Sequence, residues 1–436
     1  MKYVNTKRTG PGRAIILAAG LLLLLSAPLA FSFDWDYGGS LDNTTVLGFS
    51  EMYDETEIDQ SIRLGAWFFG LERFESGSTL EVTATGSYSA TEDRPYILDV
   101  DLLRARGIFP GALGSSSLLQ GTVGRTGFSD PTGLVLNHVA DGALVNLTYP
   151  RVRFRLGGAY TGLLISPSSS IRVSDTDYFE ESTDDEFFGP KRAIGLFDVG
   201  FGGLTLFGLL QQDLRDEADG DTIDTQYLGV NGTARLGRSG YWDGFIVASA
   251  GQSTVGSAEN EFYAFALGTG LRFFIEEWRF SRASLRGLYA SPFLPVEDVI
   301  GFNINEFKPI NEPTLGLAFS PRLSNLILTE LSYSLRPFAD PAGRHPTLDD
   351  FETKIVGRGF FRGYIGDSNY IADFDPESDS LFMGTEVELG VAARVFTDLG
   401  LGLRTAVFVP ATGSLGAFSE ERKTEWAVRL DLSTGF

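Results

Sequence analysis

The last stretch of the chain, Glu425 to Phe436, constrains the fold more than any other part of the sequence. In E-W-A-V-R-L-D-L-S-T-G-F, the residues at every second position from Trp426 to Phe436 are mostly apolar, and those between them are mostly polar. This period of two is that of a β-strand with one apolar and one hydrated face. The ten-residue span extends roughly 33 Å, and a tilt of about 40° reduces it to roughly 25 Å, the height of the apolar band of a transmembrane barrel.

A final strand of alternating apolar residues that ends on a terminal Phe resembles the closing strand of bacterial outer-membrane β-barrels. The resemblance implies export, followed by insertion through the barrel-assembly machinery, with Trp426 and Phe436 as the assembly signal. It also implies that these two aromatic side chains lie in the two interfacial girdles. The resemblance covers the export signal, the strand pattern and this terminus, and it identifies no solute.

The beginning of the chain predicts a secretory signal peptide over residues 1–32, followed by the barrel over 33–436. Lys2, Lys7, Arg8 and Arg13 precede an apolar run from 14 to 30, with no acidic residue in the segment. An uncleaved membrane helix is the alternative, but the run is shorter than the roughly 20 residues that a span needs. The sequence contains no Cys, which excludes a lipid anchor on Cys, disulfides and Cys-based metal sites.

The charge balance limits the partners of the chain. The formal net charge is -22 at pH 7, which argues against nucleic acid because phosphate binding requires a basic surface. An acidic surface is instead compatible with divalent cations, including those that bridge anionic lipids. The hydrophobic content of 43% would suit a soluble protein as well, so the periodicity and not the composition decides the class.

The rest of the chain repeats the same pattern, and we predict an all-β transmembrane antiparallel barrel of 18 strands, with boundaries that also accommodate 16. Short connectors follow the even-numbered segments and long connectors follow the odd-numbered ones, as turns and outer loops of a barrel do. A soluble β-sandwich or propeller is the alternative. The predicted strands are 33–40, 60–71, 79–90, 95–104, 117–125, 141–149, 151–164, 191–202, 204–212, 224–236, 241–252, 260–273, 281–290, 313–320, 325–336, 382–395, 401–410 and 424–436.

The phase of the alternation predicts which side chains face the lumen. An Arg at the bilayer midplane on the lipid face costs about 2 to 4 kcal/mol, so charged residues between apolar ones are expected inside. Opposed charges across a lumen favour polar solutes, although the same groups could simply pair and fill the interior. The predicted lumen residues are Arg63, Glu81, Asp99, Asp101, Arg151, Arg153, Arg155, Arg272, Arg286, Glu330, Glu386, Glu388, Arg394, Arg404, Arg429 and Asp431.

Two connectors are candidates for loops that fold into the lumen. The segment 337–381 carries Lys354, Arg358 and Arg362 among Gly and aromatic residues, and we expect it either as a constriction inside the barrel or as a lid outside. A second candidate is 124–142, which contains the turn-forming pairs Asp130-Pro131 and Asp141-Gly142.

No motif predicts catalysis, and we expect no enzyme activity and no cofactor or resident metal. The two histidines, His138 and His345, fall in predicted outer loops. The acidic segments 175–186 and 216–221 offer oxygen ligands, but their spacing does not fit a Ca²⁺ loop, and a solvated acidic loop is the simpler interpretation.

We therefore expect a porin in the outer membrane that admits small polar or charged solutes by passive diffusion. The alternative is an adhesin or receptor barrel whose long acidic loops bind a partner, and occlusion of the lumen would distinguish the two. A lipid transporter would need an N-terminal plug, for which a first strand near residue 33 leaves little room. Porins commonly form homotrimers, and no residue pattern here indicates an interface.

Overall fold

We describe a computed structural model of the chain. It describes residues 33–50, 55–91, 97–174, 176–177, 187–215, 221–255, 258–296, 303–339, 348–365 and 374–436. The expected signal peptide, His345 and most of the acidic residues of 175–186 and 216–221 lie outside these ranges.

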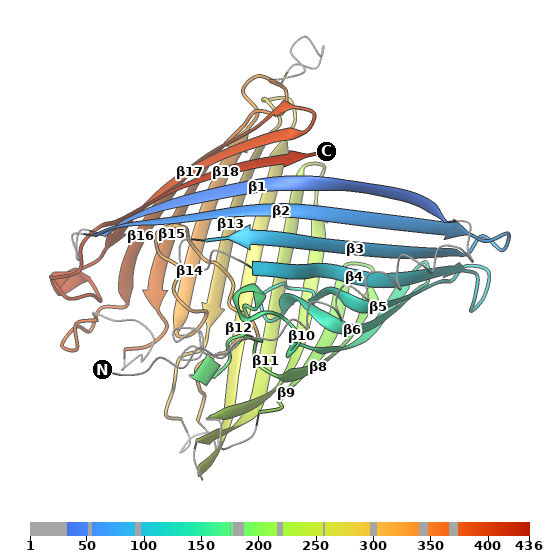
Figure 1. Cartoon of the computed structure of the whole chain (residues 1–436). Coiled ribbons are helices and arrows are strands. Elements are labelled where there is room, and N and C mark those ends of the chain that lie inside the picture. The colour runs from blue at the N-terminus through green and yellow to red at the C-terminus, as the bar shows by residue number, and fades with distance from the viewer. Residues whose placement is uncertain are drawn as a thin grey trace, which may run out of the picture.

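In the described residues, eighteen antiparallel strands form one closed ring (Figure 1). Each strand pairs with its neighbours in the sequence, and β1 pairs with β18 to close the barrel. The strands are β1 (Asp34–Ser50), β2 (Glu55–Arg73), β3 (Thr79–Ala90), β4 (Ile97–Pro110), β5 (Leu118–Ser129), β6 (Asn137–Thr148), β7 (Val152–Tyr160), β8 (Arg192–Phe201), β9 (Leu204–Asp213), β10 (Thr222–Leu236), β11 (Gly240–Val255), β12 (Ala258–Ile275), β13 (Ser281–Ala290), β14 (Leu326–Leu335), β15 (Glu352–Arg362), β16 (Phe382–Phe396), β17 (Leu399–Pro410) and β18 (Glu425–Gly435).

The outer face of the ring is apolar. Large side chains such as Leu98, Leu156, Ile246 and Leu331 are exposed there, while their neighbours along each strand point inward. A continuous apolar exterior of this kind is typical of a lipid-facing barrel and would be unfavourable in water. In the described part of the chain, no helix is long and apolar enough to cross a membrane.

The last strand closes the ring as the alternation predicted. Trp426 is exposed on the outer face, whereas Arg429 and Asp431 lie on the opposite face. The backbone N–H of Phe436 donates to Gly39 O (3.0 Å) and the Gly39 N–H donates to Phe436 O (2.8 Å). The terminal residue therefore extends the β1–β18 ladder.

The total of eighteen strands agrees with the prediction, but two of the assignments were wrong. The predicted strand 313–320 is not a strand, and β15, Glu352–Arg362, was assigned to a loop. The first strand is also longer than predicted, because β1 continues to Ser50. The two errors cancelled in the count.

The connectors divide into two sets at opposite ends of the ring. Connectors that follow even-numbered strands define the turn end, and those that follow odd-numbered strands define the loop end. The turn-end connectors are short, such as 202–203 and 397–398, with the exception of 336–351. In Figure 1, β1 to β3 run nearly horizontally and β10 to β12 run nearly vertically. The strands are therefore tilted with respect to the barrel axis.

Candidate functional site

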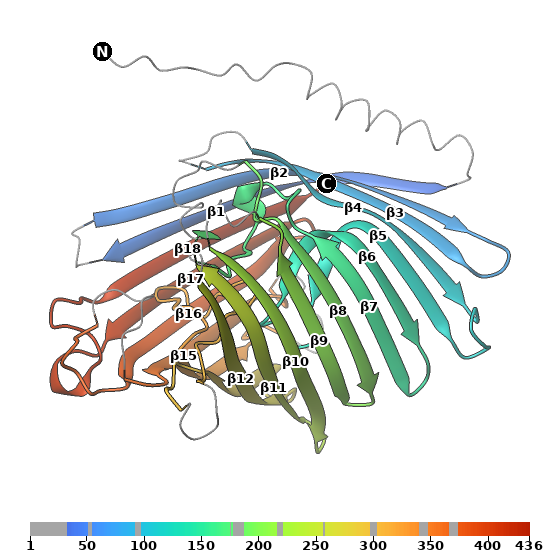
Figure 2. The same ribbon diagram turned by 90° about the horizontal axis from the view of Figure 1, so that it is seen from below.

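Three loop-end connectors fold into the lumen: 130–136, the described part of 161–191 and the described part of 291–325 (Figure 2). We call them the inserted connectors. The Ile310 N–H donates to Val135 O (2.8 Å), which joins the first connector to the third. Ile171 forms a β-bridge with Asn311, which joins the second to the third. The three segments therefore support one another inside the barrel.

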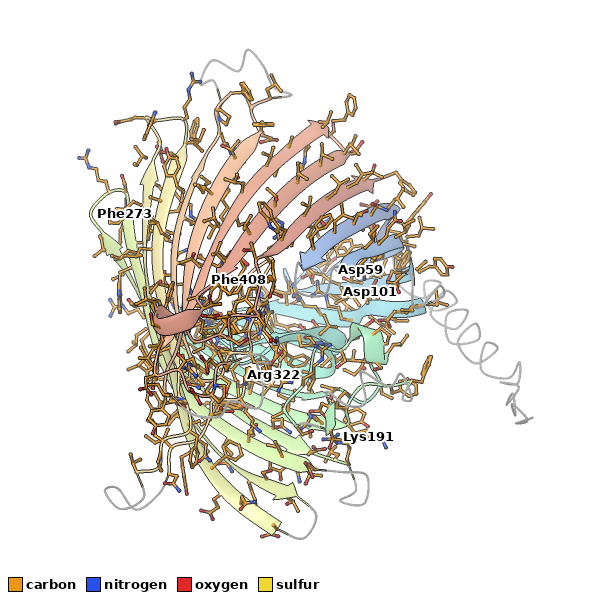
Figure 3. The ribbon with its side chains drawn as sticks, turned by 90° about the vertical axis from the view of Figure 1, so that its left-hand side faces the viewer. Asp59, Asp101, Lys191, Phe273, Arg322 and Phe408 are labelled. Atoms are coloured by element: carbon orange, nitrogen blue, oxygen red, sulfur yellow. The ribbon has the colours of Figure 1, made fainter. Side chains whose placement is uncertain are left out.

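The inserted connectors bury apolar side chains against the inner wall. Phe319 stacks on Phe408 of β17, with ring centroids 4.1 Å apart, and meets Phe360 of β15 edge to face at 5.1 Å. Leu136 and Ile310 are also buried in this cluster. Figure 3 shows Phe408 in the dense interior and Phe273 on the outer side of the barrel. The loop end of the lumen thus contains an apolar core of its own.

Glu386 on β16 holds the third inserted connector to the wall. Its side chain is fully buried and accepts hydrogen bonds from the backbone N–H groups of Leu317 (3.1 Å), Ala318 (2.9 Å) and Phe319 (2.8 Å). Hydrogen bonds to a charged group contribute about 1.5 to 3 kcal/mol each. We call residues 317–319 and Glu386 the latch.

Arg358 compensates the buried charge of the latch. Its Nη1 lies 2.6 Å from Glu386 Oε1 and 2.7 Å from Glu388 Oε2, and its Nε lies 3.0 Å from Glu330 Oε2. The side chains belong to three adjacent strands, β14, β15 and β16, and register places them on the lumen face. Three carboxylates around one guanidinium leave this cluster acidic.

The prediction that Lys354, Arg358 and Arg362 lie in a loop was wrong, because all three are on the lumen face of β15. Arg362 reaches the loop end, where its Nη2 donates to Ser378 O (3.0 Å) and its guanidinium lies 4.8 Å from the Phe374 ring centroid. Lys354 is exposed toward the turn end. Of the two predicted inserted loops, 124–142 contains the inserted connector 130–136, although most of it forms β5 and β6.

On β7, Arg153 and Arg155 lie on the face opposite exposed Phe154 and Leu156, and both pair with buried Asp198 of β8. The Arg155 Nε contacts Asp198 Oδ2, and Arg153 Nη2 lies 3.7 Å from Asp198 Oδ1. Arg151 lies in the turn before β7 and not on the strand. The expected row of three arginines is therefore a pair sharing one carboxylate.

A bulge in β4 changes which residues face the lumen. Gly86 pairs with Val100 but Thr85 pairs with Leu102, so Asp101 is an extra residue and the alternation reverses after it. Asp101 pairs with Arg63, and Asp99 lies 3.3 Å from Arg125 Nη1.

Beyond the bulge, Arg104 and Arg106 share the lumen face of Thr83 and Glu81, their partners on β3. Arg106 Nη1 lies 3.7 Å from Glu81 Oε2. The sequence did not predict that these two arginines face the lumen, because a strict period of two along β4 does not allow for the extra residue of a bulge.

The remaining predicted residues lie on the inner face of the ring, and most of them contact a residue of opposite charge on the same or a neighbouring strand. Arg272 lies 3.0 Å from Asp243, and Arg286 faces Glu330 in the ladder. Around β17 and β18, Arg404 lies 4.0 Å from Glu388 and 3.7 Å from Asp431, and Arg429 lies 2.9 Å from Asp431. Arg394 lies on the same face of β16, opposite Gly400.

One buried charge network was not anticipated from the sequence. Arg192 of β8 is fully buried, with its Nη2 2.6 Å from Asp177 and 3.1 Å from Asp213, and Arg215 lies 2.7 Å from Asp213. Asp177 also accepts the backbone N–H groups of Val173 and Ser174, so the network fixes the second inserted connector. Asp177, which we had grouped with the solvated acidic residues, is thus ion-paired.

Among the described residues, no group of three or more His, Asp or Glu side chains could hold a metal ion. His138 lies on β6 and not in a loop, and its Nε2 accepts the Ser170 N–H at 2.9 Å. His138 therefore anchors the second inserted connector.

No family model matches the sequence, and no curated protein matches it either. Solved structures are similar to the fold. Pseudomonas aeruginosa OccK11 (OpdR) superposes with a TM-score of 0.55 at 13% identity, covering 92% of this chain and 96% of that chain. P. aeruginosa OpdO gives 0.57 at 13% identity, covering 92% and 97%, and P. aeruginosa OccK2 (OpdF) in complex with glucuronate gives 0.56 at 10% identity, covering 92% and 98%.

At identities of 10% to 13% the likeness concerns the fold alone, and that fold, in the described residues, is a closed antiparallel β-barrel of eighteen strands. The predicted class of fold is therefore confirmed.

Proposed function

We propose that the chain forms a passive pathway for small polar or charged solutes across the outer membrane. The observation that carries this proposal is that the charged side chains on the inner face of the barrel differ in how much of each is exposed to solvent. The side chains of Arg63, Arg153 and Arg404 are 48%, 52% and 40% exposed, while those of Glu386 and Glu388 are 0% and 8% exposed. The pathway runs beside the inserted connectors, along the wall formed by β1 to β4, β7, β17 and β18.

The composition of this wall suits polar solutes of either sign. Arg63, Arg106, Arg404 and Arg429 alternate with carboxylates that only partly neutralise them. Guanidinium groups with carboxylates opposite them orient a charged solute and disfavour an apolar one. The glucuronate complex of the similar barrel OccK2 supports a small charged solute as the class to test first.

The test is single-channel conductance of the refolded chain 33–436 in a planar bilayer, with the cation-to-anion permeability ratio measured in a salt gradient. Discrete current steps are expected. A preparation that shows the heat-modifiable gel mobility of a folded barrel, inserts into the bilayer and passes no current would contradict the proposal.

The second candidate function is a surface-interaction barrel. The specific observation in its favour is the apolar core that the inserted connectors build inside the lumen, since an occluded barrel presents only its loops. Absence of current together with binding of the folded barrel to a cell surface or matrix protein would support this second function.

We also propose the finer points of biogenesis and assembly that the sequence predicts. These are cleavage near Phe33, folding by the barrel-assembly machinery and a homotrimer, as porins commonly form. Exposure of Trp426 on the outer face and the pairing of Phe436 with Gly39 support the role of the last strand in closure. Because Asp177 is ion-paired, a divalent cation would have to bind other acidic residues of the segments 175–186 and 216–221. Cross-linking of the refolded chain tests the trimer.

A further inference from the structure

His138 lies where the three inserted connectors come close together. It is on β6, just after the first connector, and register pairs it with buried Phe128 on the inner face of β5. The backbone N–H of its neighbour Asn137 donates to the side chain of Asn311 in the third connector. The Ser170 N–H of the second connector donates to His138 Nε2 at 2.9 Å. One imidazole ring therefore ties the second connector to the barrel wall.

The two hydrogen bonds of His138 fix its protonation state. The ring Nδ1 lies 2.5 Å from the backbone O of Val139, an atom that can only accept, so Nδ1 carries a proton. Nε2 accepts the Ser170 N–H and must therefore have a free lone pair. Only the neutral imidazole with its proton on Nδ1 meets both conditions. The contact with the second connector thus requires an uncharged His138.

Protonation of His138 would turn this hydrogen bond into a contact between two donors. The added proton binds Nε2, whose N–H then points at the N–H of Ser170. The ring is also partly buried, and a charged ring without a partner is unfavourable there. Because the folded arrangement needs the neutral ring, the contact is present at neutral pH. It is lost as the pH falls through the range in which histidine becomes charged.

The charged groups on the elements around His138 do not compensate a charged ring. Asp130 accepts backbone N–H groups of its own connector, and Asp141 pairs with Arg125 at 2.8 Å on the outer face. Among the described residues, burial and the Val139 carbonyl influence the proton on His138, and no charged side chain does so. The charged groups on these elements are Arg125, Asp130, Asp141, Arg172, Glu306, Lys308 and Glu312.

We propose that His138 is a pH-sensitive anchor, which holds the second inserted connector to the wall at neutral pH and loosens residues 166–172 in acid. Further along the connector, Asp177 is held by Arg192 and Arg215, and these ion pairs persist where carboxylates stay charged. The acid response is therefore confined to the segment beside His138. Its loosening inside the lumen would alter the pathway, and this consequence alone rests on the proposed function.

Hydrogen exchange of the refolded chain tests the anchor, read as protection factors of the amides of 166–172 at about pH 8 and about pH 5. We expect protection to fall about tenfold in acid, the scale of one hydrogen bond. His138→Gln keeps an acceptor near the position of Nε2 and does not titrate, so protection should stay high at both values. His138→Phe removes the acceptor, so protection should be low at both. Gel mobility of the folded barrel confirms that each variant folds.

His345→Gln is the matched control, because His345 is the other histidine of the sequence and lies outside the described residues. This variant should respond to pH as the unsubstituted chain does, and a response lost in it would overturn the proposal. A response that survives in His138→Gln, or that the unsubstituted chain lacks, would also overturn it. So would an equal loss of protection along β11, since acid would then loosen the whole barrel. The measurement needs no current, so failure of transport and failure of this inference are separate results.

Discussion

Two regions of the lumen wall have the same kind of residue and differ in what those residues do. Around β14 to β16, Arg358 is 11% exposed among three carboxylates, one of which holds an inserted connector. Around β17 and β18, Arg404 is 40% exposed and its nearest carboxylate oxygens are 3.7 Å and 4.0 Å away. We call these the sealed wall and the open wall.

The difference shows that alternation places a charge inside the barrel but does not assign its role. On the sealed wall, the connector excludes water, so each charge must be compensated and becomes an anchor. On the open wall, water solvates the same groups, and loosely paired arginines remain available to a solute. The described part of the connector 291–325 therefore determines which wall is dry and which is hydrated.

The largest effect should come from breaking the buried network that holds the second inserted connector. Arg192→Met leaves Asp177 and Asp213 with one guanidinium fewer in a dry site, and we expect a loss of about 3 to 5 kcal/mol in the free energy of unfolding. Urea unfolding followed by tryptophan fluorescence measures it, and hydrogen exchange should increase at residues 161–174. Arg153→Met, on a 52% exposed side chain, is the control. Equal losses in both variants would contradict the distinction between buried and exposed wall charges.

The next effect concerns the latch. Glu386→Gln keeps the shape but removes the charge that three backbone N–H groups and Arg358 share, and we expect a loss of about 2 kcal/mol. Release of residues 317–319 should also raise single-channel conductance or its fluctuation. Glu388→Gln is matched to it, because Glu388 contacts Arg358 but none of these three N–H groups. If Glu388→Gln changes the conductance as much as Glu386→Gln does, the latch does not hold the connector.

A smaller effect is expected on the open wall. Arg404→Gln removes a solvated charge, which at roughly 7 Å from a passing ion in water contributes about 0.6 kcal/mol, or close to a threefold change in permeability. Because the same charge repels a cation and attracts an anion, its removal should raise the cation-to-anion permeability ratio by up to about sevenfold, with stability nearly unchanged. Arg404→Lys keeps the charge and should keep the ratio. An unchanged ratio in Arg404→Gln would place this residue away from the pathway.

The smallest effect should come from an ion pair that belongs to neither wall. Arg73 lies 3.4 Å from Asp34 across β1 and β2, and both side chains are largely exposed. Exposed pairs contribute little, so Arg73→Gln should change the free energy of unfolding by less than about 0.5 kcal/mol. The same urea experiment measures it. A loss comparable to that of Arg192→Met would show that burial of a charged side chain does not determine its contribution to the free energy of unfolding.

The two misassigned segments have one physical cause. Residues 313–320 alternate because Leu315 and Phe319 enter the core, yet the segment bends at 317 and 318, and its N–H groups there bond a Glu side chain and not a neighbouring strand. On β15, Phe360 packs against Phe319 of this connector and Val356 is buried on the same face, while Gly357 and Gly359 occupy the lipid face. Because the inserted connector packs against the inner face of β15, that face carries apolar side chains. The sequence of β15 therefore lacks the alternation of polar and apolar residues that indicates a strand.

The sequence by itself determined the closed barrel and the strand that closes it. Those features follow from a local rule, since each strand must present one face to lipid and the other to water. Only the tertiary structure decided that Arg104 and Arg106 face inward, that Asp177 is ion-paired and that Glu386 is an anchor. Each of these features depends on a bulge or on a contact between a connector and a strand far away in the sequence. Such features produce no periodic pattern of residues from which they could be predicted.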